Sequence, residues 1–272
     1  MSQQIIIDSS KKGINLNVKE LIAYKDLLFT LAYRDLKVRY AQTALGFLWA
    51  AIQPMTTLLI FTLVFAKVAK VDTGSIPYPL FALAGMSGWT YFAFVMSQAG
   101  NSIVSAQGMI SKIYFPRLII PISKALVGLV DFGITLVFMI GLMIYYGLAP
   151  GINILFFPVF LILAIISGLT IGIWLSALTV RFRDFQQIVP FMVQLGMYAT
   201  PVAYPASLVP EKYQFIYFLN PMAGVVEGFR WSLLGGNEPN SLIFLSSALI
   251  IIFFISGLYF FRTVEKVMAD II

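Results

Sequence analysis

Four charged residues stand within or beside apolar stretches, where a charge is most able to take part in chemistry. Asp131 lies well inside a long apolar run, and Lys124 precedes it by seven residues. Because seven residues are two helical turns, the two side chains share one face. Asp131 could form a buried ion pair, bind a nearby hydroxyl, or act in a proton or ion relay. Glu227 and Arg230, at the i, i+3 spacing, could neutralise each other within one helix or bond across to another segment.

The residue sets that most catalytic sites need are missing. The chain has no Cys and no His, which excludes thiol catalysis, Ser–His pairs and zinc sites built on Cys or His. It has no G-x-x-x-x-G-K-[ST] loop for a nucleotide phosphate, no D-x-D pair and no G-x-S-x-G elbow. A membrane-embedded enzyme of lipid or glycan synthesis would need two positioned carboxylates or a base beside a nucleophile. An ion-coupled carrier would need internal repeats and several intramembrane charges. Neither pattern is visible.

Composition indicates a membrane protein. Of 272 residues, 60% are apolar and only 11% are charged, against about 25% charged in soluble domains. The uncharged runs exceed the roughly 20 residues that a bilayer-spanning helix requires. They are continuous rather than alternating, which favours helices over a β-barrel. We therefore expect an all-α integral membrane fold.

Six spans are expected, with a polar segment before them. The spans cover residues 44–66, 79–103, 118–146, 154–180, 188–204 and 241–261, and the fifth is short and broken. The polar, mixed-charge first 40 residues show no cleavable signal peptide. The sequence thus divides into a cytoplasmic segment, 1–40, and a six-helix transmembrane domain, 41–272.

The basic residues predict the orientation. With six spans, 14 of the 18 Lys and Arg residues fall on the side that holds both termini. The positive-inside rule then places both termini in the cytoplasm. This placement explains the net charge of +6 without a nucleic-acid partner.

Two segments outside the spans have apolar character. Residues 18–40 predict an amphipathic interfacial helix that lies on the membrane or packs on a partner protein. Its expected apolar face comprises Val18, Leu21, Ile22, Leu28, Phe29, Ala32 and Leu36. Residues 205–240 contain two apolar runs around Asn220-Pro221, each too short to span. They predict a re-entrant hairpin between the fifth and sixth spans, or a hairpin lying on the outer surface.

A series of short motifs stands in order around the six expected spans. The motifs are Tyr33-Arg34-Asp35-Leu36-Lys37-Val38-Arg39-Tyr40, Leu45-Gly46-Phe47-Leu48-Trp49, Gln53-Pro54, Phe115-Pro116-Arg117, Arg183-Asp184-Phe185, Thr200-Pro201-Val202, Leu219-Asn220-Pro221-Met222 and Glu227-Gly228-Phe229-Arg230. This series resembles the permease subunit of type-2 ABC exporters over nearly the whole chain, which implies a bacterial inner membrane. The resemblance is strongest to the branch that exports polysaccharides such as O-antigen, capsule and teichoic acid; a permease of the same fold for a lipid or drug is the alternative.

The resemblance implies a set of partners. Two permeases would form a homodimer with two copies of a separate ATPase subunit, which would hold ATP and Mg²⁺; this chain would be no enzyme and would bind no cofactor. Membrane lipids and a polysaccharide, with undecaprenyl as its candidate lipid carrier, would be the other partners. Residues expected to face the ATPase are Arg34 and Asp35 of the interfacial helix and Met109, Lys112, Phe115, Pro116 and Arg117 between spans two and three.

Aromatic residues are candidates for the path of a sugar polymer. They make up 15% of the chain, and sugar rings stack their apolar faces on aromatic rings. The candidates near the outer halves of spans two and five are Trp89, Tyr91, Phe92, Tyr198 and Tyr204. Trp and Tyr also favour the membrane interface, so an anchoring role is the alternative. Lys124, Asp131, Glu227 and Arg230 are the candidate intramembrane or gate charges, with Glu227 and Arg230 placed to seal the outer mouth.

Overall fold

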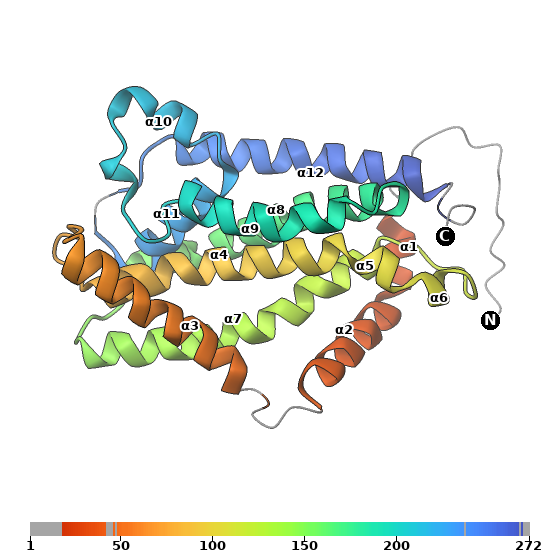
Figure 1. Cartoon of the computed structure of the whole chain (residues 1–272), viewed down its shortest axis with the longest axis horizontal. Helices are drawn as coiled ribbons and strands as arrows, with labels where there is room; N and C mark the ends of the chain where they lie inside the picture. Colours follow the sequence, from red (N-terminus) through yellow and green to blue (C-terminus); the bar gives the residue numbers. More distant parts are fainter. Residues whose placement is uncertain (1–17, 42–45, 47, 237, 267, 269–272) are drawn as a thin grey trace.

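The computed structural model describes residues 18–41, 46, 48–236, 238–266 and 268, and every element that these residues form is helical. Figure 1 shows a bundle of long, roughly aligned helices, with α2 and α3 inclined to the others. The elements are, in order, α1 (Val18–Ala23), α2 (Lys25–Tyr40), α3 (Leu48–Phe61), the π-helix η1 (Thr62–Val68), α4 (Tyr78–Gly100), α5 (Ser102–Ser105), α6 (Gln107–Ile110), α7 (Ile119–Tyr145), the 3₁₀ helix η2 (Ile152–Phe156), α8 (Phe157–Arg181), α9 (Phe185–Ala199), the 3₁₀ helix η3 (Ala206–Leu208), α10 (Glu211–Tyr217), α11 (Pro221–Leu234) and α12 (Ile243–Glu265).

Five helical stretches of the described chain are long and apolar enough to cross a membrane, and they confirm five of the expected spans. They are Leu48–Val68, Tyr78–Gly100, Ile119–Tyr145, Ile152–Arg181 and Ile243–Glu265. The chain is therefore a multi-pass membrane protein.

The expected span 188–204 is not confirmed as a full crossing. In its place α9 has 15 residues, which make a helix of about 22 Å at 1.5 Å per residue, short of the roughly 30 Å hydrocarbon layer. The helix ends where Thr200 turns to φ −108°, ψ 145°. Thr200 precedes Pro201, and a residue before proline is pushed from helical to extended backbone.

The expected interfacial helix is two helices, α1 and α2, joined at Tyr24. Leu31 and Ala32 of α2 are buried, on the face that packs on α7. Val18, Ile22 and Phe29, placed on the same face by the sequence, are exposed. The segment therefore has apolar side chains on two sides. One side covers α7, and the other is exposed.

α4 forms the centre of the bundle and is buried along most of its length. It packs mainly on α7, α8 and α11. Gly168 and Gly172, four residues apart on α8, lie so close to α4 that an added Cβ would stand 2.8 Å from Cβ of Val95 and 2.6 Å from Cβ of Ala99. Small residues at this spacing allow two membrane helices to approach closely.

The connection between α9 and α12 forms a helical hairpin of unequal burial. Asn220 caps α11 by accepting a hydrogen bond from the backbone N–H of Met222, and Pro221 occupies the first turn. α11 is largely buried against α4, α8 and α12, whereas α10 has no buried residue. The connection therefore has one buried and one exposed helix, and its re-entry into the membrane from outside stays a prediction.

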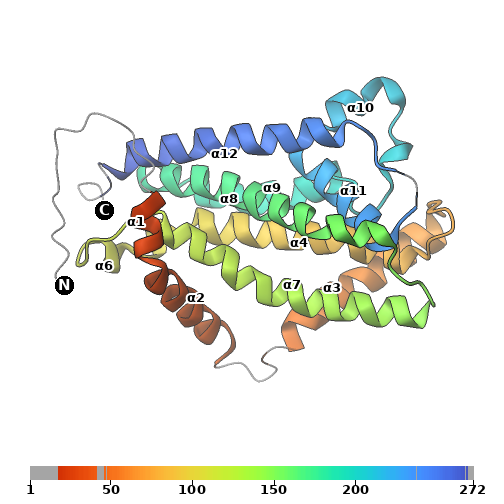
Figure 2. The ribbon, with the colours of Figure 1, turned by 180° about the vertical axis from the view of Figure 1, so that it is seen from behind.

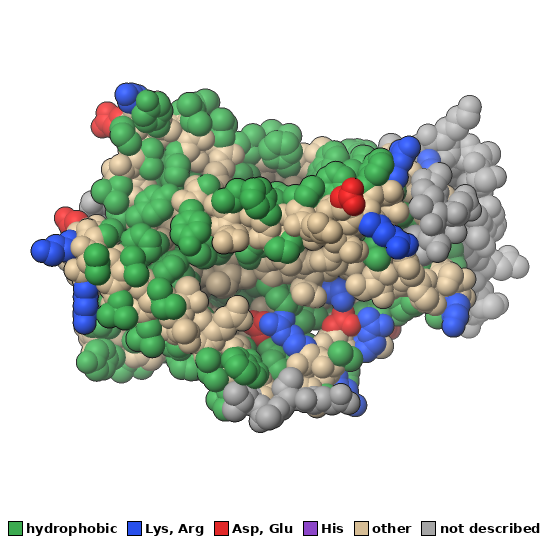
Figure 3. Space-filling model, viewed as in Figure 1, with side chains coloured by type: hydrophobic (Ala, Val, Ile, Leu, Met, Phe, Trp, Pro, Cys, Tyr) green, Lys and Arg blue, Asp and Glu red, His purple; other side chains and the backbone are tan. Residues whose placement is uncertain are grey.

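The two ends of the bundle carry different segments. α1, α6 and the C-terminal end of α12 lie together at one end, and η1 and α10 lie at the other, in both Figure 1 and Figure 2. Figure 3 shows apolar side chains over much of the visible face between the ends, with Lys and Arg gathered toward the ends and along α2.

Candidate functional site

A cavity of about 480 Å³ lies among α2, α3, α4, α7 and α9. We call it the groove. Its described lining combines aromatic rings with amides, hydroxyls and a pair of opposite charges. The rings are those of Trp49, Trp89, Tyr91, Phe94 and Phe132; the polar groups are Gln53, Thr57, Thr90, Ser97, Gln98 and Thr135; and Arg39, Tyr40 and Asp131 line it from α2 and α7.

Two ion pairs join α2 to α7 beside the groove. Nη2 of Arg39 lies 2.6 Å from Oδ2 of Asp131, and Nζ of Lys124 lies 2.5 Å from Oδ2 of Asp35. The Tyr40 hydroxyl donates a hydrogen bond to Asp131. The proposed ion pair between Lys124 and Asp131 is therefore wrong in its partners, because α2 supplies each of them with its own opposite charge.

Asp35 is held as a carboxylate by its neighbours. Burial acts to raise the pKa of its carboxyl, but hydrogen bonds from Lys124 and Arg34 outweigh burial, and the pKa lies below its ordinary value. Arg34 reaches the same carboxylate at 2.8 Å, with half of its side chain exposed. Asp35, expected to face a partner subunit, thus faces α7, whereas Arg34 remains accessible.

At the other end of the bundle, Arg230 ties α11 to α4 and to the segment after α9. Its guanidinium donates hydrogen bonds to the backbone carbonyls of Phe81, Val202 and Tyr204, at 3.2, 2.6 and 3.3 Å. Nη1 also lies 2.8 Å from Oε1 of Glu227. Both roles considered for the Glu227–Arg230 pair therefore coexist, since the pair is local and the guanidinium also bonds across to two other segments.

Two of these bonds, to the Val202 and Tyr204 carbonyls, satisfy backbone groups that lie outside any helix. Residues 200–205 leave helical structure although Thr200 and Val202 are fully buried. Irregular backbone at membrane depth is tolerated only where protein groups satisfy it, and Arg230 does so. A second cavity of about 540 Å³, lined in part by Glu227, Arg230 and Trp231, lies beside this junction.

The five candidate path aromatics do not form one set. Trp89 and Tyr91 line the groove. Phe92 is buried, with its ring 5.1 Å from the Trp89 ring. Tyr198 is exposed on α9, and its carbonyl accepts a hydrogen bond from the Tyr204 hydroxyl. The structure therefore brings two of the five into the groove and places the other three outside its lining.

The residues expected to face the ATPase are also divided. Lys112 is exposed and Met109 is half-buried, whereas Phe115 and Pro116 are buried. Arg117 donates from its backbone N–H to Oε1 of Glu265, at 2.9 Å, and from Nη1 to the Glu265 carbonyl, at 2.6 Å. The Phe115-Pro116-Arg117 motif thus anchors the connection to α12.

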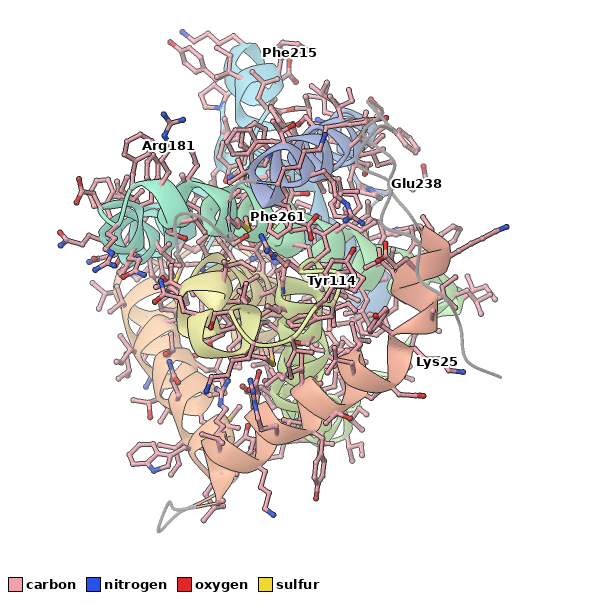
Figure 4. The ribbon with its side chains drawn as sticks, turned by 90° about the vertical axis from the view of Figure 1, so that its right-hand side faces the viewer. Lys25, Tyr114, Arg181, Phe215, Glu238 and Phe261 are labelled. Atoms are coloured by element: carbon pink, nitrogen blue, oxygen red, sulfur yellow. The ribbon has the colours of Figure 1, made fainter. Side chains whose placement is uncertain are left out.

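The exposed part of this connection lies next to that anchor. Ile113 and Tyr114 are about 60% exposed. Figure 4 views the molecule from the end that holds α1 and α6, with Tyr114 toward the middle and Lys25 nearer the edge. An exposed apolar pair at this end was not singled out by the sequence, although it directly precedes the motif.

Comparison with known proteins identifies the family. Residues 26–234 match the family model described as ABC-2 type transporter. The chain belongs to the ABC-2 type transporter family.

Relatives with functional names support a narrower group of ABC-2 transporters. The chain is 31% identical over 215 residues to the O-antigen export system permease protein RfbA of Myxococcus xanthus, covering 78% of this chain and 82% of the relative. It is 29% identical over 264 residues to RfbA of Klebsiella pneumoniae, covering 95% and 100%. It is 25% identical over 243 residues to the polysialic acid transport protein KpsM of Escherichia coli, covering 88% and 93%. Membership of the ABC-2 family implies partnership with an ABC ATPase subunit.

Sequence reasoning did not single out most residues of the groove lining, and three of them are instructive. Arg39, Trp49 and Gln53 line the groove, and each lies in a motif that supported the resemblance. A usable signal was present, because Asp35 and Arg39 on one helix complement Lys124 and Asp131 on another, with the order of acid and base reversed. Only a tertiary contact between α2 and α7 gives that pattern meaning.

Proposed function

We propose that the chain is the permease subunit of an ATP-driven exporter that carries a polysaccharide across the bacterial cytoplasmic membrane, and that the groove forms part of the path. Family membership supports the permease role, and the names of the relatives support the substrate class. A polysaccharide, rather than a drug or a simple lipid, is also favoured by the chemistry of the groove.

The observation that carries the proposal is the composition of the groove lining. A sugar ring presents apolar C–H faces and a rim of hydroxyls. The groove offers flat rings, including Trp49 and Trp89, and neutral hydrogen-bonding groups, including Gln53 and Gln98. Arg39, the one cation that the described residues bring to the lining, is paired with Asp131. The lining thus suits a neutral, hydroxylated substrate that stacks on the rings weakly enough to be transported along the path.

The assembly proposed around this path follows the family. Two permeases form a homodimer with two ATPase subunits, which hold ATP and Mg²⁺, while this chain binds no cofactor. Both termini are cytoplasmic, α1 and α2 lie at the cytoplasmic membrane surface, and α10–α11 re-enters from outside. The apolar side chains that α1 and α2 leave exposed, such as Ile22 and Phe29, support a membrane-surface position. The exported polymer is attached to an undecaprenyl-type lipid.

The conformational change produced by ATP hydrolysis is transmitted to this chain through the connection between α4 and α7. Lys112, Ile113 and Tyr114 are exposed there, and the next residues are fixed to α12 by the Arg117–Glu265 hydrogen bonds. A push on the exposed part would be passed to α7 and α12 together. Charge reversal of Lys112 should therefore uncouple ATP hydrolysis from export without loss of the dimer.

The path is tested by removing groove side chains that no fold contact requires. Trp49 and Gln53 are exposed in the groove. We expect Trp49→Ala to lower glycan export about 2- to 10-fold, as loss of one aromatic contact predicts, and Trp49→Ala/Gln53→Ala to lower it further. Phe244→Ala is the matched control, since Phe244 is 76% exposed on α12 and lies outside the groove lining.

The measurement is ATP-dependent glycan export, per amount of permease, in vesicles that contain both subunits. Wild-type export by the double variant would remove the groove from the path. Equal losses in the double variant and in Phe244→Ala would show a general effect of surface aromatics instead.

A further inference from the structure

The two ion pairs between α2 and α7 point in opposite directions. Along α2 the acid, Asp35, precedes the base, Arg39. Along α7 the base, Lys124, precedes the acid, Asp131. From the first pair to the second, the residue number rises on both helices. The two helices therefore run parallel where they touch.

This alternation opposes sliding of α2 along α7. If α2 moved forward by one pair, Asp35 would approach Asp131, and if it moved back, Arg39 would approach Lys124. Like charges repel, and the repulsion grows as water is excluded. Two pairs of the same direction would lack this property, because after a slip each new neighbour would still carry the opposite charge.

The second pair is also part of the groove. Arg39, Tyr40 and Asp131 line it, whereas Asp35 and Lys124 do not. The Arg39 guanidinium also lies 4.5 Å from the ring centroid of Phe94 on α4, another groove residue. The position of α2 on α7 therefore sets one wall of the groove.

We propose that the alternating pairs Asp35–Lys124 and Arg39–Asp131 act as a register key, which fixes α2 against α7 and so sets the shape of the groove. Arg39 is the positioning residue of that key. The consequence for export rests on the proposed function of the groove, but the key itself does not.

The shape of the groove can be measured without transport. The chain contains no cysteine, so Ser97→Cys places a unique thiol in the groove lining. The rate at which a water-soluble maleimide labels this thiol in membranes reports how accessible the groove is to water. Protein content is measured in the same membranes.

Three charge variants, made in the Ser97→Cys background, distinguish two possibilities. Either the alternating order of the ion pairs fixes the register, or the ion pairs hold α2 on α7 whatever their order. In Arg39→Asp, labelling should rise about fivefold or more, within the range that coupled charged residues show. Arg39→Asp/Asp131→Arg restores both pairs but gives them one direction, so labelling should be intermediate. Asp35→Lys/Arg39→Asp/Lys124→Asp/Asp131→Arg restores alternation, and labelling should return to the wild-type rate.

Lys37→Asp is the matched control, because Lys37 is an exposed basic residue of α2 outside both pairs. Wild-type labelling in Arg39→Asp would overturn the proposal. So would equal labelling in the double and quadruple variants, or a rise in Lys37→Asp as large as that in Arg39→Asp.

A neutral variant covers the case in which the quadruple variant does not reach the membrane. Arg39→Gln/Asp131→Asn keeps the Asp35–Lys124 pair and introduces no new charge that could block insertion, yet sliding no longer brings like charges together. Labelling should stay raised in this variant, and a wild-type rate would overturn the key. If labelling follows the key while glycan export stays at the wild-type level in all variants, the key stands and the proposed path through the groove falls.

Discussion

The junctions of α2 with α7 and of α11 with α4 are both built on charge, but in different ways. In the first, side chains bind side chains, and Arg39 and Asp131 keep 38% and 22% of their side-chain area exposed. In the second, one guanidinium binds three backbone carbonyls and Glu227. The Arg230 side chain is only 5% exposed, and its guanidinium carbon lies 3.6 Å from the ring centroid of Phe81.

The difference decides which junction can change. Backbone carbonyls cannot be exchanged by mutation, so the α11–α4 junction depends on one residue that no other side chain can replace. The charges of the α2–α7 junction are spread over four side chains, and a loss at one can be compensated at another. We infer that the first is a fixed joint of the fold, whereas the second is open to adjustment.

Loss of Arg230 should have the largest effect. Arg230→Met removes the donor to the Val202 and Tyr204 carbonyls and leaves Glu227 with only the Ala206 N–H, and breaking a buried charged network costs about 3–5 kcal/mol. Arg230→Lys should fail nearly as badly, because a single ammonium cannot replace the planar fork of donors. The measurement is the thermal unfolding midpoint in detergent by size-exclusion of heated samples.

Two variants control this prediction. Arg181→Met changes an exposed arginine and should leave the midpoint unchanged. Arg230→Met/Glu227→Gln should stay unstable, since the carbonyls remain unsatisfied. Recovery of wild-type stability in that double variant would mean that the carboxylate, rather than the backbone, sets the need for Arg230.

Crowding the same junction should cost less. An added Cβ at Gly85 would stand 2.6 Å from Nη2 of Arg230 and 3.0 Å from the Val202 carbonyl. Gly85→Ala should therefore destabilise by about 1–3 kcal/mol, as overpacking does. Gly133→Ala is the control, because its Cβ would meet nothing within 4 Å, and alanine favours a helix by up to about 1 kcal/mol. Equal midpoints for the two variants would contradict the close approach at Gly85.

Removing one partner on α7 should have a smaller and local effect. In Lys124→Met, Asp35 keeps Arg34 as its partner, so we expect a loss of about 1.5 kcal/mol, the scale of one hydrogen bond to a charged group. Hydrogen exchange should show faster opening of α2 and unchanged protection of α4. Faster exchange spread over α4 as well would show that α2 is as integral to the fold as α11.

Mild acid should have the smallest effect. The pKa of Asp35 is lowered in the folded protein, so the stability from its pairing is fully present above the unfolded value of about 3.9 and is lost only as the pH falls through the lower folded value. Protection of α2 against hydrogen exchange, corrected for the intrinsic pH dependence, should be the same at pH 7 and pH 5. Loss of protection at pH 5 would show that Asp35 is not held as an ion by its partners.

Five helices were predictable because each is a continuous apolar run long enough to cross a bilayer as a helix. The expected span 188–204, short and broken in the sequence, is not confirmed as a crossing, since α9 ends at the Thr200–Pro201 step, which opposes a helix. The mixed outcome for the candidate aromatics has another cause. Whether Trp89 faces a cavity and Phe92 its neighbours depends on how α4 is rotated among α7, α8 and α9.

The charged contacts show the same limit. Spacing along one helix correctly placed Glu227 beside Arg230, because that contact is local. The same reasoning paired Lys124 with Asp131 and failed, because α2 approaches α7 from outside the spans. The Val202 and Tyr204 carbonyls that bind Arg230 could not be predicted either, since no residue type marks a backbone group left free by the end of α9.

The burial of α4 bears on how the protein is made. Among the five long helices of the described chain, α4 has the lowest mean hydropathy and is the most enclosed by protein. Its less apolar residues contribute to this: Gly85, Ser87 and Gly88 are buried, and Thr90, Ser97 and Gln98 line the groove. During synthesis α4 emerges before α7, α8 and α11. Until these helices follow, α4 would be surrounded by lipid, and this state would be less favourable for α4 than for any other span. We expect α4 to remain beside the insertion machinery until α7 and α8 follow, and an arrested chain that ends before α7 to leave α4 extractable from the membrane by alkaline carbonate.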